Sequence, residues 1–385
     1  MRTVDVVIVG GGIIGASTAY HLVARMPGLR VVVLEREAQL GTGATAKATG
    51  GLRHQFSTAA NIRLTQLSYP EFLRFPEEHG QEIGFRAHGY LFCTSVPETW
   101  AAMSRGAALQ RSLGVPTQLL TPADARAIVP DLMVDDLLGA TYCATDGSAS
   151  ATDAHHGYVA SARARGVDIV PRASVIAIES SGGAVRAVRT LGETYLTEFV
   201  VDAAGPNVAD VAALAGVAIP ATPFRRQVFV MVHDRAVPGG LPFTVDMDTG
   251  WYVHQEASGR LLFGGTDKDN RPGVEPLVDW DGFDAVARAA LLRAPSLAER
   301  AKVAGAYCGI RTLTPDHHGI LGRVPELRGF LVATACNGHG FMHAPAVGLL
   351  LAEEILDGTA RSLDLAPLSL SRFASARQED EAATF

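Results

Sequence analysis

Short runs of consecutive apolar residues alternate along the chain with segments of helical periodicity. Residues 6–9 and 31–34 are continuously apolar and rich in β-branched side chains, which is typical of strands buried on both faces. Residues 200–206 run from a strand into a glycine turn, and residues 329–356 read as strand, glycine loop and helix. Strand–turn–helix units therefore recur at the start, middle and end of the chain, and they predict a parallel sheet built from separated segments.

The segments between these units show another pattern. Runs with some alternation of apolar and polar residues, as in a half-exposed antiparallel sheet, lie at residues 89–94, 225–233, 250–255 and 259–266. Helical segments are predicted at residues 58–78 with an interruption near Pro70, 97–114, 122–130 with Thr121 as the cap, 152–170 with a strand at its end, 207–216, and 281–303.

This order of elements predicts a mixed α/β (α+β) fold with two domains. The first is a discontinuous, Rossmann-like, nucleotide-binding domain made of residues 1–85, 145–220 and 305–375. The second carries a mixed, largely antiparallel β-sheet and is made of residues 86–144 and 221–304.

The first strand leads into a glycine fingerprint. Gly10, Gly12 and Gly15 spell G-x-G-x-x-G, in which the first glycine permits a tight turn, the second lets a pyrophosphate approach the backbone, and the third lets the helix pack on the strand. Free N–H groups at the helix start favour an anion. Glu35 ends the second strand, where a carboxylate suits ribose hydroxyls and opposes a 2′-phosphate. These features predict FAD or NAD, whereas an ordinary strand–helix turn is the alternative.

The C-terminal part of the chain favours FAD over NAD. A second glycine-rich turn, at residues 337–341, joins a strand to a helix. A nucleotide as long as FAD needs contacts from several such turns, whereas an NAD domain is usually one continuous block. The helix after this turn could direct its N-terminal dipole at a carbonyl of the reduced flavin ring.

Composition and charge exclude several other classes of protein. The net charge of -7 provides no basic surface for nucleic acid. No stretch reaches about 18 uninterrupted apolar residues, so no membrane span is expected. The cysteines show no C-x-x-C spacing, which favours a reduced, cytoplasmic protein with free thiols at positions 93, 143, 308 and 336. The polar, acidic tail at residues 376–385 is expected to fray.

Several stretches resemble the D-amino-acid oxidase superfamily of FAD enzymes, close to its glycine oxidase and sarcosine oxidase β-subunit branch. They are the glycine fingerprint with Glu35 and the segments at residues 41–53, 202–206, 309–322 and 337–355. The resemblance covers almost the whole chain. It implies an FAD-binding domain joined to a mixed-sheet substrate domain, and oxidation of the C–N bond of an amino acid, or of an N-substituted one, to an imine that water hydrolyses.

The resemblance also implies which residues contact FAD. They are Gly10, Gly12, Ile13, Ile14, Gly15, Glu35, Arg36, Thr42, Gly43, Ala44, Thr45, Thr49, Gly50, Gly51, Val175, Ala204, Gly205, Gly309, Arg311, Gly338, His339, Gly340, Phe341 and Met342.

Flavin-dependent oxidation of an amino acid needs the Cα–H over flavin N5, a neutral amine and an anchored carboxylate. Arg311 suits the anchor because its planar fork can hold a carboxylate bidentately, and the corresponding arginine has this role in the family. A structural pair with Asp316 is the alternative. Arg53 follows the Gly50–Gly51 turn that, by resemblance, passes the flavin ring. It is a second anchor, a neutraliser of reduced flavin, or a structural arginine.

One tyrosine and several histidines complete the candidates. Tyr252 matches a family strand that reaches into the substrate pocket, or it packs as a cross-strand aromatic residue. His254 faces the same side of that strand, where a histidine is more often structural. His54 is a candidate because it adjoins Arg53. His339 is expected to fix its loop or lie beside the flavin rather than act as a general base. Two adjacent pairs lack ligand partners at metal spacing and are predicted not to bind metal: His155–His156 and His317–His318.

Departures from the family pattern bear on attachment of FAD and on oxygen. Met342 stands where some sarcosine oxidases place a carboxylate-binding lysine, so the pocket relies on Arg311 or accepts a bulkier, less polar substrate. The cysteine that tethers FAD in monomeric sarcosine oxidases aligns with Gly309, so noncovalent FAD is predicted. Leu262 replaces a lysine used for oxygen activation, and Lys268 is an alternative donor of that charge. Oxygen or another redox carrier is therefore the expected electron acceptor.

The predicted substrate is a small primary or secondary amino acid. Residues 49–64 resemble subunits of sarcosine oxidases and of proline or hydroxyproline dehydrogenases, which favours glycine, sarcosine, proline, hydroxyproline or a D-amino acid. A homo- or hetero-oligomer is compatible with this resemblance. The alternatives are an FAD-dependent 2-hydroxy-acid dehydrogenase, a flavin-carrying subunit of a hetero-oligomeric amino-acid dehydrogenase and, further off, an NAD dehydrogenase.

Overall fold

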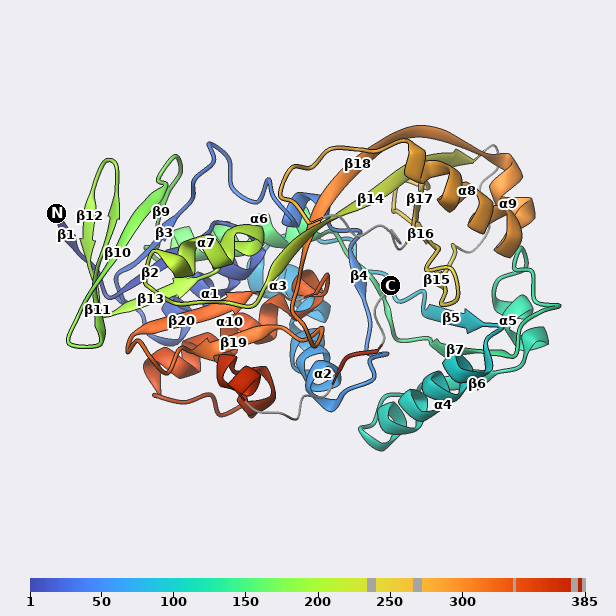
Figure 1. Cartoon of the computed structure of the whole chain (residues 1–385), viewed down its shortest axis with the longest axis horizontal. Helices are drawn as coiled ribbons and strands as arrows, with labels where there is room; N and C mark the ends of the chain where they lie inside the picture. The colour runs from blue at the N-terminus through green and yellow to red at the C-terminus, as the bar shows by residue number, and fades with distance from the viewer. Residues whose placement is uncertain (234–239, 266–271, 335–336, 375–379, 383–385) are drawn as a thin grey trace.

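The computed structural model describes residues 1–233, 240–265, 272–334, 337–374 and 380–382, so that Lys268 and Cys336 lie outside the described residues. Figure 1 shows two groups of sheets at opposite ends of the long axis of the molecule. The long strands β14 (Thr222–His233) and β18 (Ala301–Leu313) reach from the centre of the molecule into the second group. The mixed α/β fold that the sequence predicts is confirmed.

A six-stranded sheet, in the order β19-β20-β13-β2-β3-β9, forms the centre of the first group. Its strands are β2 (Val6–Val9), β3 (Val31–Leu34), β9 (Asp168–Val170), β13 (Phe199–Asp202), β19 (Ile320–Arg323) and β20 (Phe330–Thr334). All neighbours in this sheet are parallel except β19 and β20. Strand β13 lies between β2 and β20, so the predicted parallel sheet from separated segments is confirmed.

The β-branched runs of this sheet are buried on both faces, as their continuous apolar character predicts. Val6 and Ile8 pack with helices α1 (Ile13–Arg25), α6 (Ala151–Ala164) and α10 (Gly340–Leu356). Val7 and Val9 pack on the other face with α7 (Val208–Ala213) and with a four-stranded sheet. That sheet has the order β1-β12-β11-β10, with β1 (Arg2–Thr3), β10 (Val175–Ser181), β11 (Ala184–Thr190) and β12 (Thr194–Leu196).

An eight-stranded sheet, in the order β18-β14-β17-β16-β15-β5-β7-β6, forms the second group. Its other strands are β5 (Tyr90–Thr94), β6 (Gln118–Leu120), β7 (Gly139–Cys143), β15 (Phe243–Asp246), β16 (Tyr252–Gln255) and β17 (Leu261–Gly264). Its pairs are antiparallel except that of β15 and β5. One face packs with helices α5 (Pro122–Ile128), α8 (Asp281–Arg293) and α9 (Pro295–Arg300), which leaves the other face available for a site.

Helix α4 (Pro97–Ser112) lies with the second group, where it contacts β5, β6 and β7 (Figure 1). The other elements are α2 (Ala59–Leu73), α3 (Phe75–His79), the short helix η1 (Thr45–Lys47), further 3₁₀ turns η2 (Gly205–Asn207), η3 (Ala366–Leu368) and η4 (Leu370–Ala374), and the two-stranded sheet of β4 (Gly51–Leu52) and β8 (Gly147–Ser148). Strand β18 includes residue 305, at which the sequence predicts a boundary between the two domains. The domain boundaries stay a prediction.

The predicted helix over residues 281–303 is wrong at its C-terminal end. Ala294 has φ −143° and ψ 66° because the residue before a proline avoids the helical region, so two helices form instead of one. Ala301 then begins β18, in which it pairs with His233. The interruption expected near Pro70 falls at Arg74, between α2 and α3, and Pro70 itself lies inside α2. Thr121 caps α5 in a capping box with Asp124, as predicted.

The expectation that the acidic tail frays is wrong at residues 380–382. Glu381 is only 1% exposed. Its carboxylate accepts hydrogen bonds from Ser57 N (2.8 Å), Thr58 Oγ1 (2.8 Å) and Asn61 Nδ2 (2.9 Å) at the start of α2. A carboxylate is stabilised there because the first backbone N–H groups of a helix lack partners within the helix.

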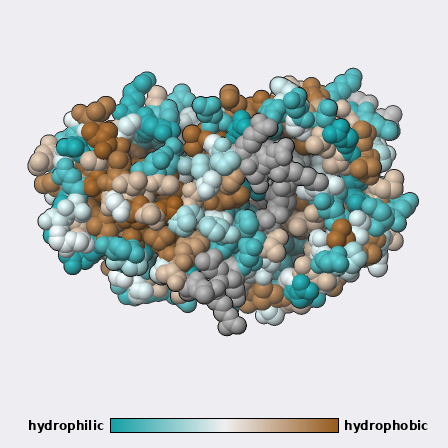
Figure 2. Space-filling model, viewed as in Figure 1, coloured by the Kyte–Doolittle hydropathy of each residue, from teal (hydrophilic) through white to brown (hydrophobic). Residues whose placement is uncertain are grey.

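Among the described residues, no helix combines the length and the apolar character that a bilayer crossing needs. Figure 2 shows hydrophilic side chains spread over both halves of the viewed face, with hydrophobic residues gathered mainly over the half that contains the six-stranded sheet.

Candidate functional site

The glycine fingerprint forms a turn that tolerates no side chain at two positions. Gly10 has φ +111°, and a Cβ there would lie 2.4 Å from the carbonyl oxygen of Ala203 at the end of β13. A Cβ on Gly15 would lie 2.0 Å from the carbonyl oxygen of Gly10. The turn and the close helix–strand packing predicted for these glycines are therefore present. Gly12 is the N-cap of α1, where a glycine leaves the first N–H groups of the helix accessible to an anion.

Glu35 lies at the carboxyl end of β3 beside this turn. Its Oε2 accepts a hydrogen bond from Gly11 N at 2.8 Å, and its Oε1 accepts one from Glu37 N at 2.8 Å. The backbone of Glu35 also bonds to Val170 and Ala173, which brings the segment that leads to Val175 alongside. Arg36 is exposed, with its Nη1 3.4 Å from Asn207 Oδ1 near the Ala204–Gly205 turn. These residues meet at the switch point between β2, β3 and β13, where dinucleotides bind in such sheets.

The segment after β3 continues the cradle. Thr45 Oγ1 accepts a hydrogen bond from Ile13 N (3.1 Å) in the first turn of α1. Gly41 contacts the ring of His155, whose Nε2 lies 2.8 Å from the carbonyl oxygen of Gly11. His155 therefore fixes the fingerprint loop. The three residues before Thr45 are exposed: Thr42, Gly43 and Ala44.

The Gly50–Gly51 turn approaches the eight-stranded sheet closely. Gly50 has φ +82°, and a Cβ there would lie 2.2 Å from the carbonyl oxygen of Ala149. A Cβ on Gly51 would lie 2.1 Å from the hydroxyl oxygen of Tyr90. Only glycine fits at either position, so this turn brings the backbone from Thr49 onward against β5. Sequence reasoning missed Tyr90, because nothing local in the strand shows that its side chain meets this turn.

Strand register decides which side chains share the free face of the eight-stranded sheet, since directly paired residues point to the same side. Tyr252 pairs with Gly264, Gly264 with Val228, and Arg226 with Gly309. This face therefore carries Tyr90, Phe92, Phe224, Arg226, Val228, Phe243, Tyr252, His254, Leu262, Tyr307, Gly309 and Arg311. The predicted pair of Tyr252 and Arg311 lies on one surface, together with Arg226 and Tyr307, which sequence reasoning did not single out.

Arg311 lies against the C-terminal glycine turn. Gly338 has φ +89°, and a Cβ there would lie 2.5 Å from Arg311 Nε. Burial, then the nearby charge of Arg226, lowers the pKa of Arg311 to about 10, so the guanidinium stays charged at neutral pH. Burial raises the pKa of Tyr252 to about 12, while Arg311 and Arg226 oppose that rise. Asp316, the alternative partner of Arg311, pairs with Arg372 at 2.6 Å.

Arg53 is fully buried and bonds to the same glycine turn. Its Nη2 lies 3.0 Å from His339 Nε2, and its guanidinium carbon lies 4.0 Å from the centre of the Phe56 ring. Burial and then Arg53 lower the pKa of His339 well below its usual range. His339 is therefore neutral, and its unprotonated Nε2 accepts a hydrogen bond from Arg53 Nη2, which places the ring proton on Nδ1. This geometry favours a loop-fixing role for His339.

The other two histidine candidates have distinct surroundings. His54 Nδ1 lies 2.8 Å from Asp146 Oδ1, its backbone N donates to the same oxygen at 2.9 Å, and its ring lies beside Tyr69. This buried pair anchors the backbone next to Arg53. His254 stacks on Phe243 with ring centres 5.0 Å apart, and burial lowers its pKa to about 3. His254 is thus a neutral packing residue on the site face.

The two C-terminal motifs are joined by hydrogen bonds. Asn337, with φ 47°, accepts a bond from Thr314 N to its Oδ1 at 3.0 Å. This bond holds the turn before α10 against the end of β18, and so sets Gly338 over Arg311. Helix α10 begins at Gly340, and no side chain of the described residues caps it, so its first N–H groups face the turn. Phe341 and Met342 are buried in the core at that end of the helix.

The structure also places the residues that the sequence links to reaction with oxygen and to covalent attachment of FAD. Leu262 lies on the site face, opposite His254 and Val230, and is buried. Cys308 is buried and faces away from Gly309, toward the opposite side of β18. Gly309 lies against Lys47, with a would-be Cβ 3.0 Å from Lys47 Cβ.

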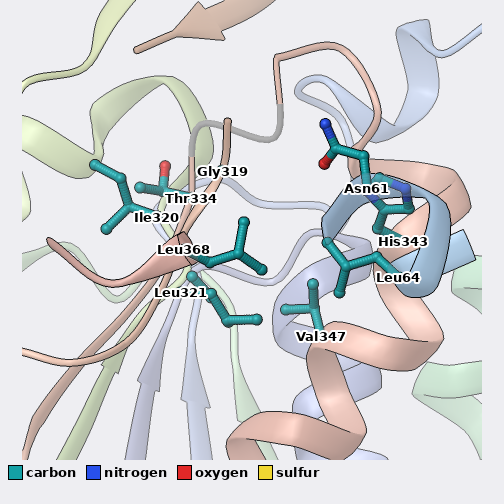
Figure 3. A pocket seen from close by; sticks show the side chains of 10 residues that line it. Asn61, Leu64, Gly319, Ile320, Leu321, Thr334, His343, Val347 and Leu368 are labelled. Carbon is teal, nitrogen blue, oxygen red and sulfur yellow. The ribbon is translucent and has the colours of Figure 1, made fainter. Parts of the chain in front are cut away.

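A small separate cavity of about 20 Å³ lies between α2, α10 and the strands β19 and β20 (Figure 3). Leu64, Leu321, Val347 and Leu368 form much of its wall, with Asn61, Thr334 and His343 at its polar side. It has room for about one water molecule and none for a substrate.

The residues present fit FAD. Glycine turns that a Cβ would fill lie at the end of β2, at Gly50–Gly51 and at Gly338, and Glu35 stands where a ribose binds. The fingerprint and Thr45 would hold the pyrophosphate. The turns at Gly50–Gly51 and Gly338, with the start of α10, would hold the ring next to Arg311. The fold and these turns define a dinucleotide-dependent oxidoreductase.

The chain belongs to the DAO family of FAD dependent oxidoreductases, which it matches over residues 5–354, and its cofactor is FAD. It is 32% identical to the glycine oxidase of Geobacillus kaustophilus (strain HTA426) over 379 residues, which cover 96% of this chain and 97% of that protein. It is 28% identical to the mitochondrial sarcosine dehydrogenase of Mus musculus, of which it spans 41% while 96% of this chain is covered. The crystal structure of L-proline dehydrogenase from P. horikoshii matches with a TM-score of 0.91 and 28% identity, covering 98% of this chain and 100% of that one.

Proposed function

We propose that the protein oxidises the C–N bond of a small amino acid, or of an N-substituted one, with FAD as the oxidant. Membership of an FAD dependent oxidoreductase family supports the cofactor. Glycine oxidase, sarcosine dehydrogenase and L-proline dehydrogenase are named for a primary, an N-methyl and a cyclic amino acid, which supports an amino acid as substrate. The observation that carries the proposal is the charged guanidinium of Arg311 on the sheet face beside the Gly338 turn.

Arg311 binds the substrate carboxylate in this proposal. Its position is fixed by β18 on one side and by the Gly338 backbone on the other. Its fork can hold both carboxylate oxygens, and burial strengthens that attraction. The hydroxyl of Tyr252 stays protonated at neutral pH, since burial raises its pKa to about 12, and it can donate a hydrogen bond to the same carboxylate.

The reaction converts the substrate C–N single bond to an imine. FAD, when bound, would accept the Cα–H hydrogen as a hydride, while the amine lone pair forms the C=N bond of an iminium. The iminium loses its N–H proton to solvent to give the imine, which water then hydrolyses to a carbonyl compound and an amine or ammonia. The chain holds the Cα–H in place through Arg311 and excludes water with the aromatic face of Tyr90, Phe92 and Phe243. A neutral amine is needed, and the cluster of cations around Arg311 favours it by opposing an ammonium group.

We also infer three properties that follow from the site residues. The apolar Leu262 on the site face favours slow reaction with oxygen and transfer of electrons to another carrier. Gly309 at the position of a tethering cysteine favours noncovalent FAD. Burial raises the pKa of the Cys143 thiol to about 12, so this thiol stays protonated at neutral pH, and a reducing, cytoplasmic location stays a prediction. A homo- or hetero-oligomer stays a prediction.

Anaerobic mixing of the holoenzyme with single substrates tests the proposal. Glycine, sarcosine, proline, hydroxyproline and D-amino acids should bleach the oxidised flavin band, whereas 2-hydroxy acids should not. Arg311→Gln should raise KM by roughly 100- to 1,000-fold, as expected when one partner of a buried charge pair is removed. The matched control is Arg126→Gln on the exposed surface, where 49% of the side chain is accessible. Bleaching by 2-hydroxy acids alone would contradict the amine assignment.

A further inference from the structure

A second arginine lies next to Arg311 on the site face. Arg226 on β14 pairs with Gly309 on β18, and Arg311 pairs with Phe224, so the two arginines are diagonal neighbours across one antiparallel strand pair. Diagonal neighbours have Cα atoms about 7–8 Å apart, within reach of long side chains. Gly309 places no side chain between them.

The surroundings show that the two guanidinium groups share one environment. Arg226 is the largest charged influence on Arg311, and both act on the phenol of Tyr252, which lies on the same face. Arg226 is half-buried and its Nη1 donates to the carbonyl oxygen of Arg225 at 3.0 Å, which holds part of the guanidinium along the strand. Each of the two guanidinium groups adds positive potential to this part of the face, which favours an acid group placed near both.

A single small amino acid has one carboxylate, and Arg311 with Tyr252 can satisfy it. A bidentate carboxylate occupies one guanidinium fork, so a second guanidinium on the same face suits a second acid group of the same molecule. We propose that Arg226 forms a second carboxylate-binding position, and that the preferred substrate is an amino or imino acid with two carboxylates. This inference rests on the proposed function and narrows its substrate class.

Non-oxidisable acids test binding apart from turnover. The holoenzyme is titrated with malonate, succinate and glutarate, and with acetate and butyrate as single-charge counterparts, while the flavin spectrum reports binding. The best diacid should bind about 10- to 100-fold more tightly than the matched monoacid, the range expected for one added charge-assisted hydrogen-bonded pair. Arg226→Gln should reduce that ratio to about one. Arg225→Gln should leave the ratio unchanged, since Arg225 is the neighbouring arginine on the opposite face of β14.

Turnover provides the second readout. Iminodiacetate, aspartate and glutamate, each enantiomer included, are compared with glycine, sarcosine and proline by kcat/KM. We expect a 10- to 100-fold preference for the best diacid, which Arg226→Gln abolishes. A preference for monoacids, or a diacid preference that Arg226→Gln leaves intact, overturns the inference and keeps the proposed function. Loss of FAD from purified Arg226→Gln also overturns it, because the arginine then serves the cofactor. Absence of flavin bleaching by any amino acid instead overturns the proposed function.

Discussion

Substitution Gly338→Ala would displace the guanidinium of Arg311 while the arginine itself stays in the chain, so it tests whether the exact position of this guanidinium matters. The new Cβ would lie 2.5 Å from Arg311 Nε, 2.9 Å from its Cζ and 3.0 Å from its Nη2. Ordinary contact between such atoms needs about 3.5 Å, so the guanidinium has to move by about 1 Å. The φ of +89° adds backbone strain of roughly 1 kcal/mol for alanine.

A displacement of this size should act mainly on catalysis. Misplacing a substrate-positioning group by about 1 Å costs about 100-fold in rate. We therefore expect kcat/KM of Gly338→Ala, expressed per bound FAD, to fall about 100-fold, while the free energy of unfolding falls by only about 1 kcal/mol. Anaerobic flavin reduction gives the first quantity, and urea unfolding gives the second.

Gly358→Ala is the matched control. Gly358 has φ +84°, but no other group of the described part of the chain lies within 4 Å of a Cβ built there. It carries the same backbone strain without contact to Arg311, so it should lose about the same stability and keep the parental kcat/KM. If Gly338→Ala retained kcat/KM within about threefold of this control, the close contact between the turn and Arg311 would have no role in positioning substrate.

Three further outcomes follow from the described contacts. Glu381→Gln should lower the free energy of unfolding by about 2–3 kcal/mol in urea, because its buried carboxylate accepts bonds from the start of α2; an unchanged midpoint would show the tail to be dispensable. Burial opposes ionisation of Glu71, but hydrogen bonds from His21 and His79 outweigh burial and hold the pKa of Glu71 well below the ordinary 4.5. The ionised carboxylate therefore stabilises the fold above pH 4.5, and this stabilisation is lost as the pH falls below that value. Glu71→Gln should therefore flatten the acid side of a stability–pH curve, and parallel curves would refute this. Leu262→Lys should speed reoxidation of reduced flavin by oxygen at least tenfold in stopped flow, and an unchanged rate would show that another feature limits oxygen use.

Local sequence was sufficient for the strands and turns of the first group of sheets. Residues 6–9 and 31–34 are buried on both faces, as continuous β-branched runs predict. The glycines at positions 10 and 15 have contacts that allow no side chain, which is why a fingerprint is readable without a structure. The C-terminal end predicted for the helix at residues 281–303 was wrong because the helical periodicity of the sequence continues past Pro295, whereas the backbone changes direction before this proline.

Side-chain partners from distant segments were not readable. His54 was a site candidate through its neighbour Arg53, yet its bond goes to Asp146, far along the chain. Adjacent residues of an extended segment point in opposite directions, so proximity in sequence does not identify the side-chain partner of His54, and its role in the site stays a prediction. Glu381 was placed in a fraying tail because composition alone does not reveal the donors of α2 that bind it.

The pairing of β14 with β18 shows why the set of side chains on the site face depends on contacts between distant segments of the chain. Slipping this pairing by one residue would turn every side chain of β14 to the other face, so that Arg225 would replace Arg226 beside Arg311. The register is continuous from Thr222 to Val230 and shifts only between Val230 and Met231, beyond the arginines. The site-facing part of the strand therefore has one defined alignment. Which charge meets the substrate depends on that alignment, and no motif within either strand encodes it.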